Sequence, residues 1–205
     1  MRVNPTLPAD QVHAFVLAGG ASRRMGQDKA LLALHGMPVA RWIASQLAAH
    51  VGRVWIVAKR GQGWEDFGLP VLHDVTEERA LVHGIRAALE AAGPPWRFIV
   101  ACDMPGVSFG ETLTALWRAA SAAGAPGSFP RRPDRAGLEP LPSLWHADLA
   151  RAVRPEWGLE AQGWLRAAGL AEWRVAAAED AQLDNLNTPE AWRGFRNRQA
   201  EERRS

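Results

Sequence analysis

The strongest constraint on the fold is a series of short, nearly continuous apolar runs separated by segments with helical spacing. Residues 13–18 (HAFVLA) form one such run, and residues 98–102 (FIVAC) form another. Between them, residues 38–50 carry apolar side chains at a helical period. Strands that are apolar throughout and alternate with helices are typical of a mainly parallel sheet covered on both faces. The sequence therefore predicts a three-layer α/β fold.

We expect the alternation to continue along the chain, within a single domain comprising residues 1–205. Further strands are expected at residues 53–58, 71–72, 139–144 and 173–177. Helices are expected at residues 38–50, 81–92, 110–123, 146–153 and 160–168, and a last one starts at Thr188-Pro189-Glu190. Residues 124–137 are rich in Gly, Pro and Arg, which predicts a mobile loop with solvated Arg131, Arg132 and Arg135.

Composition excludes several classes of protein. With 205 residues and 47% hydrophobic content, the chain can bury one substantial core. Its apolar runs are far shorter than the roughly 20 residues of a membrane helix, so we expect a soluble, cytoplasmic protein without a membrane partner. The single cysteine, Cys102, cannot form an internal disulfide, and the six histidines lack metal-ligand spacing. A net charge of +2 with dispersed basic residues does not indicate a nucleic-acid partner.

A glycine-rich loop, Leu17 to Lys29, follows the first apolar run. The pair Gly19-Gly20 lets the backbone approach a polyphosphate, and Arg24 and Lys29 supply positive charge. Lys29 is one of only two lysines in the chain, so an ammonium at this position is not generic surface charge. The spacing matches neither the P-loop nor the dinucleotide fingerprint. The loop suits a triphosphate, and an ordinary strand-to-helix turn is the alternative.

Asp103 stands at the carboxyl end of the apolar run 98–102, where open α/β sheets bind ligands. Mg²⁺ takes one or two carboxylates together with phosphate oxygens and water. Asp103 is therefore the candidate metal ligand, and the alternative is an aspartate that caps the turn before Pro105.

Four segments together resemble the molybdenum cofactor guanylyltransferases, a branch of the nucleotidyltransferase superfamily. They are LAGGASRRMGQDKALLALHGMP from Leu17, CDMP from Cys102, EPLPSLW from Glu139 and DNLNTPEAW from Asp184. The resemblance implies a Rossmann-like nucleotidyltransferase fold with a mainly parallel mixed sheet. It also implies transfer of GMP from GTP to the phosphate of molybdenum-molybdopterin, with Mg²⁺ as cofactor and release of pyrophosphate. Partners would be other cofactor-assembly proteins, and the chain would be a monomer or weak homo-oligomer.

The resemblance also assigns site residues. Lys29, Arg24 and Asp103 would be catalytic, and Asp103 would bind the magnesium. The residues expected around the nucleotide and its metal are Leu17, Ala18, Gly19, Gly20, Lys29, Asp74, Asp103, Asn185 and Asn187. Among them, Asp74 would lie near the guanosine, and the two asparagines would lie at the edge of the site, near the acceptor or the metal.

Departures from the family pattern leave alternatives open. Val57 stands where an asparagine often ends the second strand, and His83 stands where the family has a small residue. The alternatives are nucleotidyl transfer to a sugar-1-phosphate or another small molecule, cytidylyl transfer to the pterin, and nucleotide binding without catalysis. Residues 193–205 form a basic tail that suggests a weaker fourth idea, an interaction protein. The ten tryptophans are interpreted mainly as core packing, with Trp145 and Trp164 the better candidates for stacking on a ligand.

Overall fold

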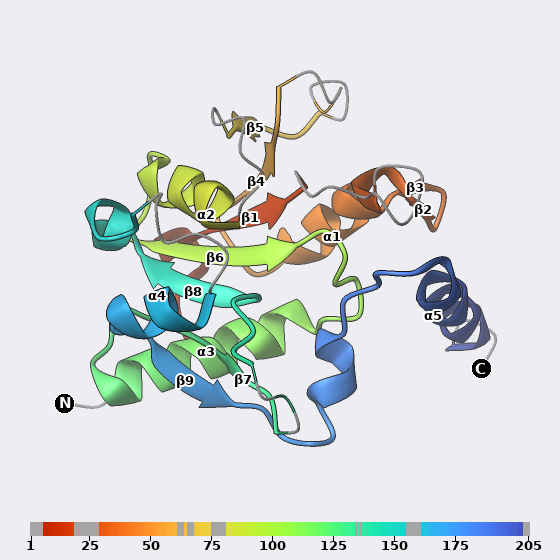
Figure 1. The fold of residues 1–205 in the computed structure, drawn as a ribbon. Coiled ribbons are helices and arrows are strands. Elements are labelled where there is room, and N and C mark those ends of the chain that lie inside the picture. The colour runs from red at the N-terminus through yellow and green to blue at the C-terminus, as the bar shows by residue number, and fades with distance from the viewer. Residues whose placement is uncertain are drawn as a thin grey trace.

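The computed structural model describes residues 6–18, 29–60, 64, 68–74, 81–133, 135, 137–154 and 161–202. Its centre is a seven-stranded sheet (Figure 1). In spatial order the strands are β5 (Val71–His73), β4 (Arg53–Ala58), β1 (Val12–Leu17), β6 (Trp96–Ala101), β8 (Ser143–His146), β7 (Gly127–Arg131) and β9 (Ala171–Arg174). Over the described residues, no helix has the length and apolar character needed to cross a membrane.

The sheet is mainly parallel, as the sequence predicts. β1 pairs in parallel with β4 and β6, β4 with β5, and β7 with β9. β8 runs antiparallel to both of its neighbours, β6 and β7, so the remaining strands all run in one direction. In Figure 1 the arrowheads of β1, β6 and β9 point to the side of the molecule on which the last helix lies.

Five α-helices accompany the sheet within the described residues: α1 (Val39–Leu47), α2 (Leu81–Glu90), α3 (Phe109–Ala123), α4 (Ala161–Ala167) and α5 (Pro189–Glu202). Short 3₁₀ helices connect them: η1 (Ala9–Gln11), η2 (Lys29–Leu31), η4 (Ala147–Arg151) and η6 (Asp180–Leu183). A small hairpin pairs β2 (Ala33–Leu34) with β3 (Met37–Pro38), and its turn places His35 and Gly36 at φ 52° and 80°.

Side-chain alternation along the strands assigns α2, α3 and α4 to the two faces of the sheet. Arg97 and Trp145 are opposite one another on β6 and β8. Arg97 bonds carbonyls at the end of α2, and the Trp145 ring stacks on Trp164 of α4 at 5.8 Å. Ser128 of β7 points the other way and donates to the Leu116 carbonyl of α3 at 2.6 Å. Helices α2 and α4 therefore cover one face, α3 covers the other, and the three-layer fold is confirmed.

Trp145 and Trp164 belong to the core. They are 0% and 3% exposed and pack against one another, so their exposed area offers no platform for a ligand. Their burial favours the core-packing interpretation of the tryptophans.

The mobile loop predicted for residues 124–137 is wrong for its first half. Residues 127–131 form β7, which is hydrogen-bonded between β8 and β9. Glycine and proline depress strand propensity, but tertiary pairing overrides this preference here. A Cβ on Gly127 would lie 2.2 Å from the Leu144 carbonyl oxygen, so the glycine permits a close approach of two strands.

Three other predicted elements shift or change type. The strand expected at 173–177 is β9 at 171–174. The strand expected at 139–144 is β8 at 143–146, because Pro140 and Pro142 lack the N–H groups a sheet requires. The helix expected at 146–153 is a 3₁₀ helix at 147–151.

Candidate active site

Parallel strands bring the residues that follow them to one edge of the sheet. At this edge lie Ala18 after β1, Asp103 after β6, Asp74 after β5 and Arg132 after β7. Gly19, Gly20 and Arg24 fall outside the described residues, so their roles remain predictions. The described ends of the glycine-rich loop, Leu17-Ala18 and Lys29, both lie at the site.

The centre of the site is a contact among three residues far apart in sequence. Lys29 begins η2, and its Nζ lies 3.3 Å from Oδ2 of Asp103. The same ammonium donates a hydrogen bond to Oδ1 of Asn187. The Lys29 and Asp103 side chains are 17% and 20% exposed, so both groups are partly shielded but accessible to a ligand. The structure thus brings together three residues that the sequence nominates for one site.

Backbone hydrogen bonds fix the frame of this contact. The Ala18 N–H donates to the Val57 carbonyl at 2.8 Å, which continues the pairing of β1 with β4 beyond the end of β1. The Leu186 N–H donates to the carbonyl of Asp103 at 2.7 Å. The Asp103 backbone is therefore tied directly to the segment that carries Asn185 and Asn187.

A second ion pair stands further along the same edge. Asp74 continues from β5, its N–H donates to Ala58, and its carboxylate lies 2.7 Å from Nζ of Lys59. Both side chains are at least four-fifths buried, since that of Lys59 is 17% exposed and that of Asp74 is 10% exposed. Lys59 is a site residue that the sequence interpretation misses, although it carries a usable signal as the second of the chain's two lysines. Three steps between neighbouring strands separate β5 from β6, about 14 Å at roughly 4.8 Å per step.

Arg132 corrects the sequence interpretation most clearly. The sequence predicts a solvated loop for Arg132, yet the residue is 3% exposed. Its guanidinium bonds both carboxylate oxygens of Asp180 at 2.6 and 2.7 Å and Oδ1 of Asp184 at 2.7 Å. It also donates to the carbonyls of Asp180 and Leu183, at 2.9 and 3.2 Å.

The Arg132 network affects the acid–base behaviour of its members. The hydrogen bonds from Arg132 hold the pKa of the Asp180 carboxyl below its ordinary value. Hydrogen bonding to Asp180 raises the pKa of Arg132, so the guanidinium stays charged. Arg135 adds a contact of 3.2 Å to Asp184, and with its side chain 53% exposed it matches the solvated arginine that the sequence predicts.

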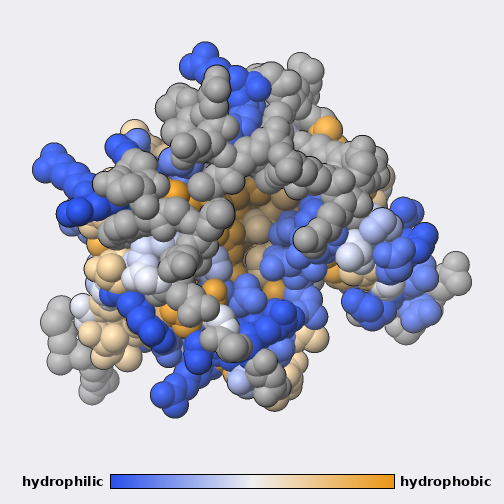
Figure 2. Space-filling model, viewed as in Figure 1, coloured by the Kyte–Doolittle hydropathy of each residue, from blue (hydrophilic) through white to orange (hydrophobic). Residues whose placement is uncertain are grey.

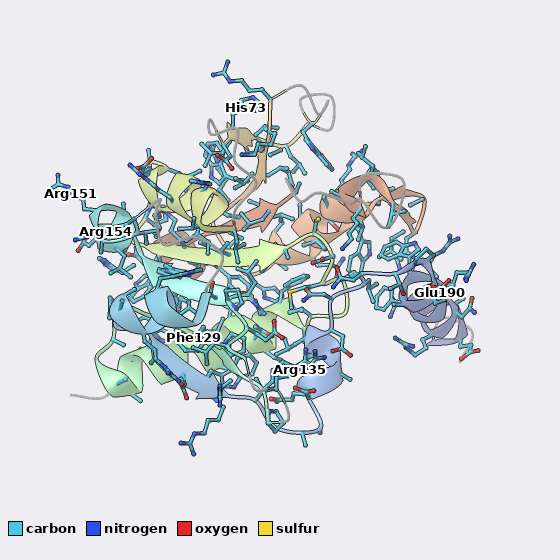
Figure 3. All side chains as sticks on the ribbon, viewed as in Figure 1. His73, Phe129, Arg135, Arg151, Arg154 and Glu190 are labelled. Atoms are coloured by element: carbon cyan, nitrogen blue, oxygen red, sulfur yellow. The ribbon has the colours of Figure 1, made fainter. Side chains whose placement is uncertain are left out.

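A cavity of about 810 Å³ adjoins the central contact. Its polar lining is Arg132, Arg135, Glu139, Gln182, Asp184, Asn185, Asn187, Glu190, Arg198 and Gln199. Arg135 beside η6 and Glu190 on α5 are labelled in Figure 3 and mark the two elements that border it. Figure 2 shows hydrophilic residues gathered over this end of the sheet and over α5. Because Asn187 lines the cavity and accepts a hydrogen bond from Lys29, the cavity borders the central contact.

The side chains at the centre of the site suit a metal ion whose remaining ligands come from the enzyme's substrate. Over the part of the chain described, no group of three or more His, Cys, Asp or Glu side chains is arranged to hold a metal ion. Asp103 offers a single accessible carboxylate. That is too few ligands for a structural zinc site, but it fits magnesium completed by phosphate oxygens and water.

Solved structures share this fold. The fold matches molybdopterin-guanine dinucleotide biosynthesis protein A from Archaeoglobus fulgidus with a TM-score of 0.75 at 22% identity, over 92% of this chain and 99% of that one. A nucleotidyl transferase from Methanothermobacter matches with a TM-score of 0.71 at 23% identity, over 92% and 97%. The fold is that of the nucleotidyltransferases.

The sequence comparisons identify the family. Residues 14–181 match the model of the MobA-like NTP transferase domain. The molybdenum cofactor guanylyltransferase of Cupriavidus necator is 32% identical over 87% of this chain and 93% of its own length. A probable molybdenum cofactor guanylyltransferase of Synechococcus elongatus is 29% identical over 89% and 96%. This chain belongs to the MobA-like NTP transferase family and is a nucleotidyltransferase.

Proposed function

We propose that this protein transfers GMP from GTP to the terminal phosphate of molybdenum-molybdopterin and releases pyrophosphate. The product would be a molybdopterin guanine dinucleotide cofactor. Relatives named as guanylyltransferases support the choice of donor and acceptor. The observation that carries the proposal is the Lys29–Asp103 contact at the carboxyl edge of the sheet, since it pairs a phosphate-binding cation with a metal-binding carboxylate.

The donor GTP lies along the edge of the sheet. Its triphosphate contacts Lys29 and the loop that starts at Leu17-Ala18, and its guanosine extends toward Asp74. The separation of about 14 Å between the strands leading to Asp103 and Asp74 suits an extended nucleotide. Lys59 holds the Asp74 carboxylate in a fixed orientation for a hydrogen bond to the nucleoside.

Transfer proceeds by in-line attack. An oxygen of the acceptor phosphate forms a bond to the α-phosphorus of GTP, and the bond from that phosphorus to the bridging β-phosphate oxygen breaks. The electron pair leaves with pyrophosphate, whose developing charge the Lys29 ammonium stabilises. Asp103 would hold magnesium, which when bound neutralises charge on the phosphate oxygens. Positioning and charge neutralisation account for catalysis, and no protein nucleophile is required.

The acceptor occupies the cavity beside Asn187. Its cationic lining, Arg135 and Arg198, complements the phosphate of the pterin, while Asn185 and Asn187 offer amide groups. Glu139 and Glu190 on the same lining accept hydrogen bonds from the N–H groups of a pterin ring. The cavity volume of about 810 Å³ is large enough for such a ligand.

A donor and acceptor screen tests the proposal. Pyrophosphate release is measured with GTP, CTP, ATP and UTP, each with molybdopterin, its molybdenum-loaded form or a sugar-1-phosphate. Release with GTP and the pterin alone, abolished in Asp103→Ala, supports it. Release with CTP or a sugar phosphate would replace the substrate assignment and keep the mechanism. No release with any pair would favour a nucleotide-binding protein without this activity.

A further inference from the structure

Among the residues that the structure describes, two arginines are almost completely buried, and they have different partners. Arg97 is 2% exposed and donates to main-chain carbonyls, with Ala88 at 3.0 Å and Ala91 at 2.6 Å. Arg132 is 3% exposed and bonds two carboxylates as well as two carbonyls. Burying a guanidinium is costly unless its donors are satisfied. The Arg97 bonds join β6 to the end of α2, whereas those of Arg132 join β7 to the carboxylates of residues 180–184.

The Arg132 contacts lead directly to the catalytic centre. Residues 184–187 directly follow η6 and end at Asn187. Within them, the Asp184 carboxylate accepts from Arg132 at 2.7 Å, and the Leu186 N–H donates to the Asp103 carbonyl at 2.7 Å. Asn187 then accepts from Lys29. One short segment thus links the arginine to the backbone of Asp103 and to the ammonium of Lys29.

η6 also touches the loop that follows Asp103. The Ser108 N–H donates to Oε1 of Gln182 at 3.1 Å. A Cβ placed on Gly106 would lie 3.3 Å from the carbonyl oxygen of Gln182, so the two backbones are in close contact. A displacement of η6 would therefore disturb the loop that follows Asp103, at both Gly106 and Ser108.

We propose that Arg132 is a positioning residue for nucleotidyl transfer: it clamps η6 and residues 184–187, and thereby sets Asn187 and the Asp103 backbone around Lys29. The predicted loss of rate rests on the proposed function. The predicted loosening of residues 184–187 rests only on the contacts described above. A rigid support is required because a misplacement of about 1 Å at a catalytic group can lower the rate about 10²-fold.

The test compares Arg132→Gln with the matched control Arg97→Gln, since both remove one buried guanidinium. Arg132→Lys keeps the charge but cannot bind Asp180 through two parallel hydrogen bonds. Asp180→Asn and Asp184→Asn weaken the same network at partly exposed positions, where misfolding is less of a danger. Each variant is measured for thermal midpoint, for kcat and KM of pyrophosphate release, and for hydrogen exchange of the Leu186 amide.

The expected result is a loss of about 10²-fold in kcat for Arg132→Gln, with partial recovery in Arg132→Lys. Arg97→Gln should lower the thermal midpoint and leave kcat per folded molecule unchanged. Exchange of the Leu186 amide should accelerate in Arg132→Gln, Asp180→Asn and Asp184→Asn but not in Arg97→Gln.

Two results would overturn the inference. One is an unchanged kcat in Arg132→Gln, Asp180→Asn and Asp184→Asn. The other is a Leu186 amide that stays fully protected in the Arg132 and Asp180 variants. If the wild-type protein releases no pyrophosphate with any donor, the proposed function fails, and the amide exchange still decides whether Arg132 holds the segment.

Discussion

The ammonium of Lys29 lies 3.3 Å from the carboxylate of Asp103, although 74 positions separate the two residues. Parallel pairing of β1 with β6 produces this contact, because it brings the loop after each strand to the same edge of the sheet. The bond from Leu186 to the Asp103 carbonyl adds a third, C-terminal segment. The site is therefore assembled by sheet topology rather than by local sequence.

Lys29→Ala and Asp103→Asn should each lower kcat by about 10²- to 10³-fold, since each removes a preorganised charge. Both side chains are partly exposed, so the free energy of unfolding should change little. Steady-state pyrophosphate release and urea unfolding are measured in parallel. Arg151→Ala, at the opposite end of the molecule from α5 (Figure 3), is the control and should keep full activity. Near wild-type turnover in either variant would exclude that residue from the mechanism.

Removal of divalent metal should abolish turnover reversibly. Excess EDTA is expected to stop pyrophosphate release, and added Mg²⁺ should restore it, because one carboxylate holds the ion only together with the substrate phosphates. In Asp103→Asn the Mg²⁺ concentration for half-maximal rate should rise. A rate that is independent of EDTA would contradict the assignment of a metal to Asp103.

Asp74→Asn should mainly weaken the binding of the donor nucleotide, GTP. It removes a charged hydrogen-bond acceptor held by Lys59, and such bonds contribute roughly 1.5–3 kcal/mol, so the KM for GTP should rise about 10-fold or more. The value of kcat at saturating GTP should fall far less. Full GTP and CTP titrations measure both constants. A fall in kcat at unchanged KM would place Asp74 with the reacting phosphates rather than with the nucleoside.

Gly127→Ala should destabilise the protein without acting on the chemistry. Its Cβ would meet the Leu144 carbonyl oxygen at 2.2 Å, and overpacking of this kind costs about 1–3 kcal/mol or more. Gly163 in α4 is the matched control, because a Cβ there has nothing within 4 Å. Gly163→Ala should stabilise the helix by about 0.5–1 kcal/mol. Urea unfolding compares the two; equal stabilities would show that the β7–β8 approach is looser than described.

Acid should weaken the Arg132 network in a defined pH range. The pKa of Asp180 is lowered in the folded protein, so its ionised form stabilises the fold above the unfolded value of 3.8. That contribution is lost as pH falls through the lower, folded pKa. The stability difference between wild type and Asp180→Asn should therefore be constant from neutral pH to about pH 4 and shrink below it. Urea unfolding from pH 7 to pH 2 measures the difference; a gap that widens below pH 4 would contradict the assignment.

The parallel half of the fold could be predicted from the sequence. The strand at 53–58 matches β4 at both ends, and the apolar runs that end at Ala18 and Cys102 become neighbouring parallel strands. Their apolar character is sufficient because both faces are covered by helices. β7 could not be predicted, because its sequence GSFPR contains a glycine and a proline and forms a strand only through its neighbours.

The site residues also divide into those that the sequence could identify and one that it could not. Lys29 and Asp103 could be nominated because their residue types suit phosphate and metal, and Asn187 could be nominated through the resemblance to the guanylyltransferases. Arg132 could not, because its role depends on Asp180 and Asp184, which are 48 and 52 positions away. In sequence alone, Arg132 is indistinguishable from the solvated Arg135. Only burial separates the two residues, and burial is a property of the tertiary fold.

The most direct test of guanylyl transfer follows isotopic label from GTP into the products. The wild-type protein is incubated with molybdenum-molybdopterin and Mg²⁺, with GTP labelled at either the α- or the γ-phosphate. Attack at the α-phosphorus predicts that α-label enters a pterin dinucleotide and γ-label leaves as pyrophosphate, with both events slowed by about 10²- to 10³-fold in Asp103→Asn. Transfer of γ-label to the acceptor, or α-label that remains in free nucleotide, would contradict the account.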